Sequence, residues 1–303
     1  MKAIFAAAVS AAVLAASPAV ADSWKDQYKT VKFGILSGEN EKDRIARYTP
    51  FEKYLENELG VDVEIFTAGS YDGVIQAMAA DQIEFAFFGS SSYAAAYTET
   101  NGGVVPLVSR LQKDGSTGYF SVVAVRCDSG YKTLDDLKGK TLAFADPDST
   151  SGYAVPYFNL SKQGYEPKTY FGAIPFSGAH ETGVLGVYNK QYDAAATYIT
   201  NEEDGIPQRM VTKGMIEKDA ICTIWKSPEI TSGPLAARSN LPKGLIDAMR
   251  TAVMEIPEKD TLAFIEMTGG EDSTQEAWIE VDHDRYQWIV EMRDWLKKQR
   301  RGG

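Results

Sequence analysis

The order in which strand-like and helix-like segments follow one another constrains the fold more than any other feature of the sequence. Apolar residues alternate with polar or small ones over 31–35, which is typical of a strand. Residues 51–59 have helical spacing, and Gly60 fits the end of that helix. A strand, a helix and a strand are expected next, at 61–65, 74–78 and 83–88. This β-α-β-α-β order favours a parallel sheet with helices on its faces.

The same alternation begins again at Thr133–Asp136, whose spacing is that of a capping box. A strand is expected at 142–145, a helix from Tyr153, a second helix around 184–188 and a strand at 193–197. The sequence therefore predicts an α/β protein of two lobes. Each lobe is expected to be a mostly parallel sheet flanked by helices, with a ligand in the crevice between the lobes.

The charge balance excludes two classes of partner. The chain has 303 residues, with 31 Lys and Arg against 42 Asp and Glu, so its formal net charge is −11. Proteins that bind nucleic acid or anionic membranes need clustered Lys and Arg, and this balance argues against both partners. Hydrophobic residues make up 44% of the chain, which is enough to bury a globular core.

The first 21 residues have the features of a cleaved export signal. Lys2 precedes an apolar run over 3–16, which is too short to span a bilayer. Ala19–Ala21 then supplies the small-x-small pattern of a cleavage site, so we expect the mature chain to begin near Asp22. The alternative is a buried N-terminal helix, which the Ser-Pro pair after the apolar run would interrupt.

The two cysteines, Cys127 and Cys222, each lie at the edge of an apolar run. Two thiols in an oxidising compartment often pair, so a disulfide and two buried free thiols are both open interpretations. The two cysteines and the two histidines are too scattered for a zinc site. The sequence predicts no metal and no cofactor.

The segment Asp146–Gly152 carries the most informative chemistry. It connects an expected strand to an expected helix, and it brings together the hydroxyls of Ser149, Thr150 and Ser151. The unpaired N–H groups and the dipole of a helix N-terminus can hold an oxyanion without any Lys or Arg. An ordinary Ser/Thr N-cap is the alternative interpretation.

Two further polar residues lie at the starts of expected elements. Tyr119 comes just before a strand at 120–125, and His180 comes just before a helix. On its own, a histidine such as His180 is more often structural or exposed than in contact with a ligand.

Short segments in a fixed order give the chain a family resemblance. They are Gly34-Ile35, Tyr48–Phe51, Tyr71–Gln76, Asp114–Tyr119, Asp146–Gly152, Gly178–Thr182, Asn189–Asp193 and Ile224–Pro228. Together they resemble the periplasmic phosphonate-binding proteins of ABC importers, within the phosphate, phosphite and phosphonate substrate-binding family. The resemblance covers about residues 30–235, and its specificity lies in the ordered set.

The resemblance implies the two-lobed type II periplasmic binding protein fold, in which the chain crosses between the lobes twice. We therefore expect lobe 1 at 22–121 and 235–303, and lobe 2 at 122–234. The family holds the phosphonate oxygens with residues that match Ser149, Thr150, Ser151, Tyr119 and His180.

The resemblance also bears on the organic end of the ligand. Tyr71 matches a tyrosine near that end. Relatives that bind aminoethylphosphonate hold its ammonium with two acidic residues. Glu202 or Glu203 is the candidate for the first acid, with a gap in the alignment, and Gly233 stands at the second position. The missing acid favours a smaller ligand such as methylphosphonate or phosphite, or an ammonium held by aromatic rings.

The sequence as a whole predicts a monomeric periplasmic protein that captures a phosphonate-type oxyanion and delivers it to the membrane permease of an ABC importer. The alternatives are a binding protein for phosphite or another small phosphorus oxyanion, and a sensory protein of the same fold. We expect no enzyme and no catalytic residues, because the chain has neither a Gly-x-x-x-x-Gly-Lys loop nor a nucleophile elbow.

Overall fold

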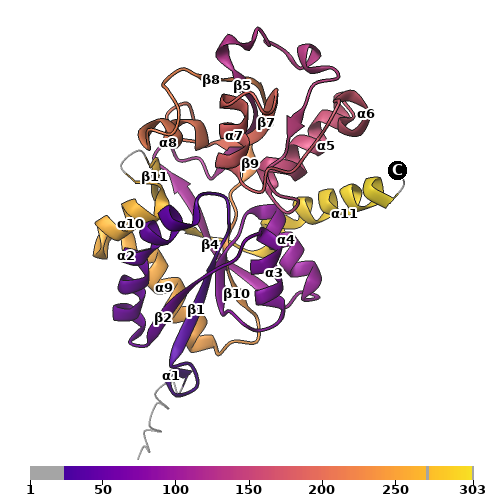
Figure 1. Cartoon of the computed structure of the whole chain (residues 1–303). Helices are drawn as coiled ribbons and strands as arrows, with labels where there is room; N and C mark the ends of the chain where they lie inside the picture. Colours follow the sequence, from indigo (N-terminus) through magenta and orange to yellow (C-terminus); the bar gives the residue numbers. More distant parts are fainter. Residues whose placement is uncertain (1–23, 271–272, 302–303) are drawn as a thin grey trace, which may run out of the picture.

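The computed structural model describes residues 24–270 and 273–301. The export signal expected at 1–21 lies outside the described residues. Within the described ranges the chain forms two lobes, each built on its own β-sheet; the first is in the lower half of Figure 1 and the second in the upper half. No helix in these ranges combines the length and the apolar character needed to cross a membrane.

Six strands form the sheet of the first lobe. They are β1 (Thr30–Ile35), β2 (Asp62–Thr67), β3 (Phe85–Phe87), β4 (Val104–Gln112), β10 (Leu235–Arg238) and β11 (Gln275–Glu280). Their order across the sheet is β11-β4-β10-β3-β1-β2. Val31, Phe33 and Ile35 are buried, as the alternation along β1 predicts. Strands β2 and β3 both pair in parallel with β1.

Helices cover both faces of this sheet. They are α1 (Trp24–Gln27), α2 (Glu41–Leu59), α3 (Tyr71–Ala79), α4 (Ser90–Glu99), α9 (Lys243–Lys259) and α10 (Thr261–Thr268). Helices α2, α9 and α10 pack on one face, and α3 and α4 on the other (Figure 1). The side chain of Asn40 caps the start of α2, and Gly60 ends it with a φ of 66°. The expected helix end at Gly60 is therefore confirmed.

The second lobe has a five-stranded sheet. Its strands are β5 (Gly118–Arg126), β6 (Leu142–Ala143), β7 (Ala194–Ile199), β8 (Ile221–Lys226) and β9 (Ile230–Thr231). The order is β6-β7-β5-β8, and β9 pairs with β5. Around it lie α5 (Val155–Lys162), α6 (Pro167–Tyr170), α7 (His180–Tyr188), α8 (Ile206–Thr212) and the short turns η1 (Cys127–Ser129), η2 (Leu134–Leu137) and η3 (Thr150–Ala154).

The α/β class and the two-lobed fold are confirmed, but the expectation of mostly parallel sheets is wrong. Strand β10 is antiparallel to both β3 and β4, and β11 is antiparallel to β4. Strand β5 is antiparallel to β7, β8 and β9. The cause lies in the crossings between the lobes: β4 leads into the second lobe and β10 returns from it, so the two strands run in opposite directions.

The C-terminal helix α11 (Gln287–Arg301) contacts both lobes. Its buried residues Ile289, Met292 and Leu296 belong to the apolar core of the second lobe, while the helix also packs along α4. Figure 1 shows α11 running beneath α5 at the junction. The boundaries expected at 121/122 and 234/235 stay a prediction, and α11 joins the two parts that they would separate.

The two cysteines form a disulfide, which decides between the two open interpretations. Cys127 in η1 is joined to Cys222 in β8, next to β5 in the sheet. The bond closes a segment with a sequence separation of 95 residues. A cross-link over so long a segment restricts the unfolded chain strongly.

We predict that removing this disulfide destabilises the protein without changing its fold. The double variant Cys127→Ser with Cys222→Ser should lose about 4 kcal/mol of unfolding free energy, because its unfolded chain regains the entropy of a long open loop. Urea unfolding followed by tryptophan fluorescence measures the difference. Reduced wild type should match the double variant. Equal stability of the oxidised and reduced proteins would contradict the prediction.

Candidate ligand-binding site

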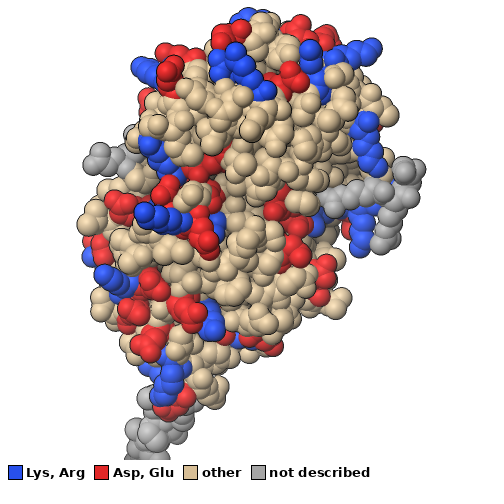
Figure 2. Space-filling model, in the orientation of Figure 1, with Lys and Arg blue, Asp and Glu red and all other residues tan. Residues whose placement is uncertain are grey.

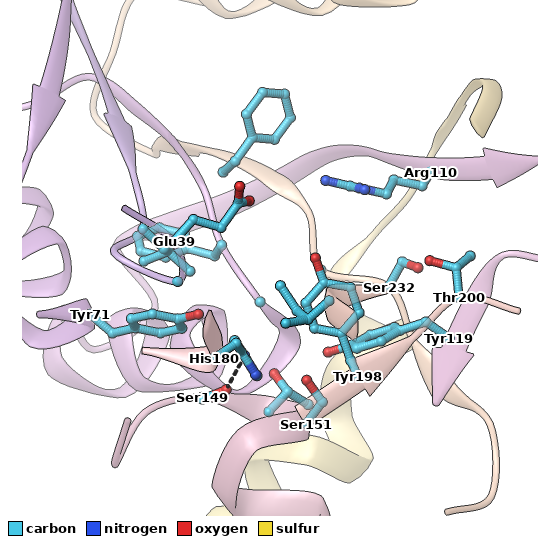
Figure 3. A pocket seen from close by; sticks show the side chains of 18 of the residues that line it. Glu39, Tyr71, Arg110, Tyr119, Ser149, Ser151, His180, Tyr198, Thr200 and Ser232 are labelled. Atoms are coloured by element: carbon cyan, nitrogen blue, oxygen red, sulfur yellow. Dashed lines mark hydrogen bonds between the residues drawn. The ribbon is translucent and has the colours of Figure 1, made fainter. Parts of the chain in front are cut away.

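A cavity of about 180 Å³ lies between the two lobes (Figure 3). Its volume is many times the roughly 10–15 Å³ that one water molecule needs. Both lobes contribute to its wall, which is mostly polar and aromatic. The polar and aromatic lining residues are Glu39, Arg47, Tyr48, Tyr71, Phe87, Phe88, Arg110, Gln112, Tyr119, Ser149, Thr150, Ser151, His180, Tyr198, Thr200 and Ser232.

Most of the site residues predicted from the sequence meet in this cavity. Its lining includes the predicted residues Tyr71, Tyr119, Ser149, Thr150, Ser151 and His180. Ser149 and His180 are buried, and Tyr119 is half-buried. The structure thus brings together residues that lie up to 109 positions apart in the chain.

Four helical segments begin at the wall of this cavity. Tyr71, Ser90 and His180 are the first residues of α3, α4 and α7, and Thr150 is the first residue of η3, which continues into α5. Each N-terminus has N–H groups that find no partner within their own helix, and it carries a partial positive charge. Their convergence makes the cavity electropositive before any charged side chain is counted.

The turn before η3 is held in shape by its own polar groups. The buried carboxylate of Asp146 accepts hydrogen bonds from the N–H of Tyr71 (3.2 Å) and from the N–H of Asp148 (2.8 Å). Ser149 Oγ accepts from the N–H of Gly152 at 3.0 Å. A Cβ at Gly152 would lie 2.8 Å from His180 Cε1 and 2.5 Å from the Cβ of Ala145, so only glycine fits there.

The hydroxyls of the turn face the two predicted tyrosines. Tyr119 interacts with the side chains of Ser151 and Thr150, and Tyr71 interacts with Ser149. Burial raises the pKa of Tyr119 to about 12 and raises the pKa of Tyr71 as well. Both phenols therefore keep their protons at neutral pH and can donate hydrogen bonds into the cavity.

His180 is held between the two lobes at the start of α7. Its Nε2 lies 3.2 Å from Ser149 Oγ, and its Nδ1 lies 3.2 Å from Thr197 Oγ1. Its backbone N–H donates to the carbonyl oxygen of Gly38 at 3.1 Å. Burial lowers the pKa of the imidazole from 6.5 to about 4, although Glu39 acts in the opposite direction. His180 is thus neutral at physiological pH.

Glu202, the residue expected to hold an ammonium group, does not line this cavity, and its role in ligand binding stays a prediction. The side chain is exposed and lines a separate surface hollow with Lys226. The cause is a tight turn: Asn201 Oδ1 accepts hydrogen bonds from the N–H groups of Glu203 and Asp204, which directs Glu202 outward. Glu203 is exposed as well.

Three charged residues that line the cavity were not predicted from the sequence. They are Glu39, Arg47 and Arg110. Arg47 Nη2 donates to Glu39 Oε1 at 2.7 Å, and Lys213 Nζ lies 3.3 Å from Glu39 Oε2. Burial opposes ionisation of Glu39, but the charges of Arg47, Arg209 and Lys213 prevail and hold its pKa at about 2. Glu39 is therefore ionised, and its negative charge is balanced by the neighbouring cations.

Arg110 differs from Arg47 in its surroundings. It projects from β4 into the cavity, from the side opposite Ser149 and Ser151 (Figure 3). Among the described residues, no carboxylate lies within ion-pair distance of its guanidinium. Burial raises the pKa of Tyr119 and Tyr198, and the charge of Arg110 lowers the pKa of both phenols by a smaller amount.

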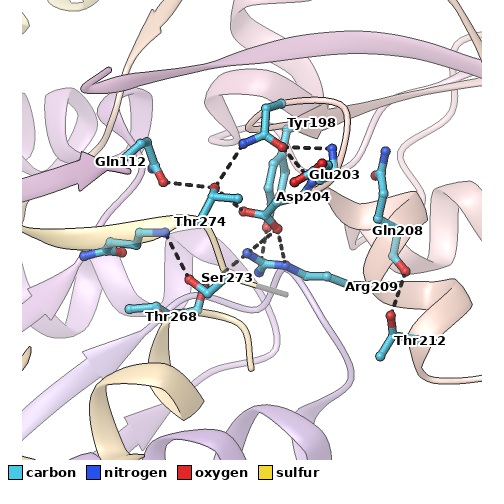
Figure 4. Close-up of polar contacts among 12 residues, drawn as sticks. Gln112, Tyr198, Glu203, Asp204, Gln208, Arg209, Thr212, Thr268, Ser273 and Thr274 are labelled. Carbon is cyan, nitrogen blue, oxygen red and sulfur yellow. Dashed lines mark hydrogen bonds and ion pairs between the residues drawn. The ribbon is translucent and has the colours of Figure 1, made fainter. Parts of the chain in front are cut away.

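Polar contacts beside the cavity connect the two lobes (Figure 4). Arg209 of α8 forms a buried ion pair with Asp204 at 2.9 Å and donates to the carbonyl oxygen of Thr268 at 3.2 Å. Asn201 Nδ2 donates to Thr274 Oγ1 at 3.1 Å. Lys213 adds its ion pair with Glu181 in the second lobe at 2.6 Å to its contact with the first lobe. These contacts hold the lobes around the cavity.

Gly233 lies in the wall of the cavity, where the chain returns to the first lobe. A Cβ at this position would lie 1.9 Å from the carbonyl oxygen of Phe88 and 2.6 Å from the Cα of Gly89. No side chain fits at Gly233 without movement of the backbone. The second acid that the family resemblance led us to look for at this position is therefore incompatible with the packing around Gly233.

We predict that burial of neutral His180 makes the protein less stable at acid pH. The pKa of its imidazole is lower in the folded than in the unfolded protein. Above about pH 6.5 the imidazole is neutral in both states, so its contribution to the free energy of unfolding does not change with pH. As the pH falls from 6.5 to 4, only the unfolded state takes up the proton, and about 3 kcal/mol of stability is lost.

The comparison of wild type with His180→Gln isolates this effect from other titrating groups. Urea unfolding at pH 7, 5.5 and 4 should show a steeper loss of stability for wild type. If the two proteins lose stability in parallel over this range, His180 is solvated in the folded state.

The sequence matches a known family over most of its length. Residues 33–278 match the family described as "ABC transporter, phosphonate, periplasmic substrate-binding protein". The chain is 36% identical over 230 residues to the phosphonates-binding periplasmic protein of Escherichia coli K12; the match covers 74% of this chain and 64% of that relative's length. It is 32% identical over 232 residues to the phosphate-import protein PhnD of Mycolicibacterium smegmatis, covering 74% of this chain and 70% of the relative.

Solved structures agree with this match. A binding protein component of an ABC phosphonate transporter from Pseudomonas aeruginosa superposes with a TM-score of 0.77 at 27% identity, covering 89% of this chain and 87% of the other. PhnD1 from Prochlorococcus marinus, in complex with methylphosphonate, also gives 0.77, at 21% identity and with 89% and 99% coverage. At 21% identity, the similarity to PhnD1 shows a shared fold only. The chain belongs to the family of periplasmic substrate-binding proteins of phosphonate ABC transporters.

Proposed function

We propose that this protein is exported to the periplasm with loss of residues 1–21, captures a phosphonate-type oxyanion, and delivers it to the permease of an ABC importer. One observation carries the proposal: the hydroxyls of Ser149, Thr150 and Ser151 face a cavity on which helix N-termini converge. Such a site stabilises an oxyanion through N–H and O–H donors.

In this proposal the oxyanion accepts hydrogen bonds from the three hydroxyls of the turn and from the phenol of Tyr119. Tyr71 was expected near the organic end of the ligand, but its phenol interacts with Ser149, so we assign it to the oxyanion as well. Neutral His180 orients the hydroxyl of Ser149. The imidazole Nε2 and Nδ1 lie 3.2 Å from Ser149 Oγ and Thr197 Oγ1. In the tautomer that carries the proton on Nε2, the imidazole donates to Ser149 Oγ, and the Ser149 proton is left for the ligand. Thr150 Oγ1 accepts from the N–H of Ser91 at 2.8 Å and likewise keeps its proton for the ligand.

The size of the cavity supports a phosphonate with an organic group over bare phosphite or phosphate. A volume of about 180 Å³ exceeds what the oxyanion alone would fill. The wall around the remaining space contains Tyr48 and Tyr198, whose rings suit a carbon-bonded substituent.

We also propose that the protein acts as a monomer and has no nucleic acid partner. Figure 2 shows acidic and basic side chains interspersed over the face in view, without a large basic patch. The net charge of −11 supports the absence of a nucleic acid partner, because phosphate backbones repel an acidic protein.

We predict that Ser151→Ala weakens phosphonate binding about ten- to a hundredfold. A hydrogen bond to a charged group contributes roughly 1.5–3 kcal/mol, and each 1.4 kcal/mol is a factor of about ten. Calorimetric titration with phosphite, phosphate, methylphosphonate, aminoethylphosphonate and its N-methylated forms measures the loss.

The control is Ser239→Ala, which removes an exposed hydroxyl that does not line the cavity. This variant should bind like wild type. If Ser151→Ala also keeps the affinity of wild type for every ligand in the panel, the turn is not the oxyanion site and the proposal fails.

A further inference from the structure

The end of the cavity opposite the serine turn contains an arginine whose charge no described residue neutralises. Arg110 lies in β4, two residues before Gln112 at the end of the strand, and its guanidinium points into the cavity (Figure 3). A guanidinium kept in a partly buried wall without a carboxylate partner is costly unless a ligand supplies the partner. The serine turn does not need Arg110, because it has its own donors.

The charges in the wall do not balance. The ionised side chains that line the cavity are Glu39, Arg47 and Arg110, because burial keeps His180 neutral. Arg47 is bound to Glu39 at 2.7 Å, which leaves Arg110 as the surplus charge. Lys213 adds a second cation to Glu39 from the other lobe. The wall opposite the turn is therefore positive.

Among the residues that the structure describes, the same wall offers no free acid for an ammonium group. Glu39 already has two cationic partners, and Glu202 points away from the cavity. Gly233 cannot be replaced by an acidic residue without a clash with Phe88. An amino group placed here would meet the guanidinium of Arg110 instead of a carboxylate.

Further hydrogen-bond donors line the cavity near this end. The hydroxyls of Thr200 and Ser232 lie on the same side as Arg110 in Figure 3, and Tyr198 lies between this side and the turn. A guanidinium together with hydroxyl donors is the arrangement that binds a carboxylate, through two parallel N–H···O bonds and additional O–H···O bonds.

We infer that the organic end of the ligand carries a second anionic group, and that the preferred ligands are phosphonocarboxylates whose carboxylate binds Arg110. The inference rests on the proposed function, since it assumes that the phosphonate occupies the serine turn. It makes Arg110 a specificity-determining residue that discriminates between ligands with the same phosphonate head and different tails.

The test uses three ligands of similar length that differ in the charge of the tail: 3-phosphonopropionate, propylphosphonate and 2-aminoethylphosphonate. Wild type should bind the carboxylate at least about tenfold more tightly than the alkyl ligand, and the amine most weakly. Arg110→Met keeps an apolar stem of similar size and removes the charge. This variant should lose the preference for the carboxylate and keep its affinity for methylphosphonate.

The control variant is Arg250→Met, which removes a surface arginine of α9 outside the cavity and should retain the wild-type order. Three outcomes separate the inference from the function on which it rests. If wild type binds no phosphonate at all, the proposed function fails and the inference fails with it. If wild type binds methylphosphonate but binds the amine as tightly as the carboxylate, only the inference is overturned. If Arg110→Met retains the preference for the carboxylate, another residue recognises the tail and Arg110 has no such role.

Discussion

The site depends on bringing four helix N-termini to one cavity. Helices α3 and α4 come from the first lobe, whereas α7 and η3 with α5 come from the second. Partly positive ends that face each other across a partly buried cavity repel. The hydrogen bonds across the junction, such as that from the Tyr71 N–H to Asp146, oppose this repulsion. An anion between the ends would remove it, so ligand binding and closure of the lobes support each other.

Charged side chains around the cavity confine the positive potential of the helix N-termini to the site. The protein is acidic overall, and long-range attraction does not favour an anionic ligand. The acid nearest to the site, Glu39, is held by Arg47 and Lys213 so that it contributes no free negative charge. The pair formed by Arg209 and Asp204 is buried beside the cavity and connects the lobes instead of contacting the ligand space.

The sequence was a reliable guide where the signal is local. Ser149–Ser151 and His180 lie at helix starts, and such positions can be recognised from neighbouring residues, whereas Tyr71 was expected only from the family resemblance. Strand direction was not predictable in this way, because β10 pairs with β3 and β4 over long sequence separations.

The missed residues show which signals are non-local. Arg110 is the one charged residue of β4 and stands just before the chain crosses to the second lobe. That position was the available clue, but the direction of the side chain depends on how the lobes meet. Glu39 follows β1 at the edge of the sheet where α/β proteins bind ligands, and could have been found by that rule. Glu202 lies outside the cavity lining, next to a turn at Asn201 whose side-chain hydrogen bonds an alignment with a gap does not show.

The close packing at Gly233 has a consequence for how this protein can change over evolution. Because a Cβ there would overlap the carbonyl oxygen of Phe88, a single substitution cannot introduce an acid at this point of the wall. An ancestor or descendant with an acid at this position would need to move two chain segments together. Substitutions at Arg110 face no such barrier, since its side chain already extends into open space. Divergence in ligand choice should therefore proceed first through the position on β4, while the crossing segment stays constant.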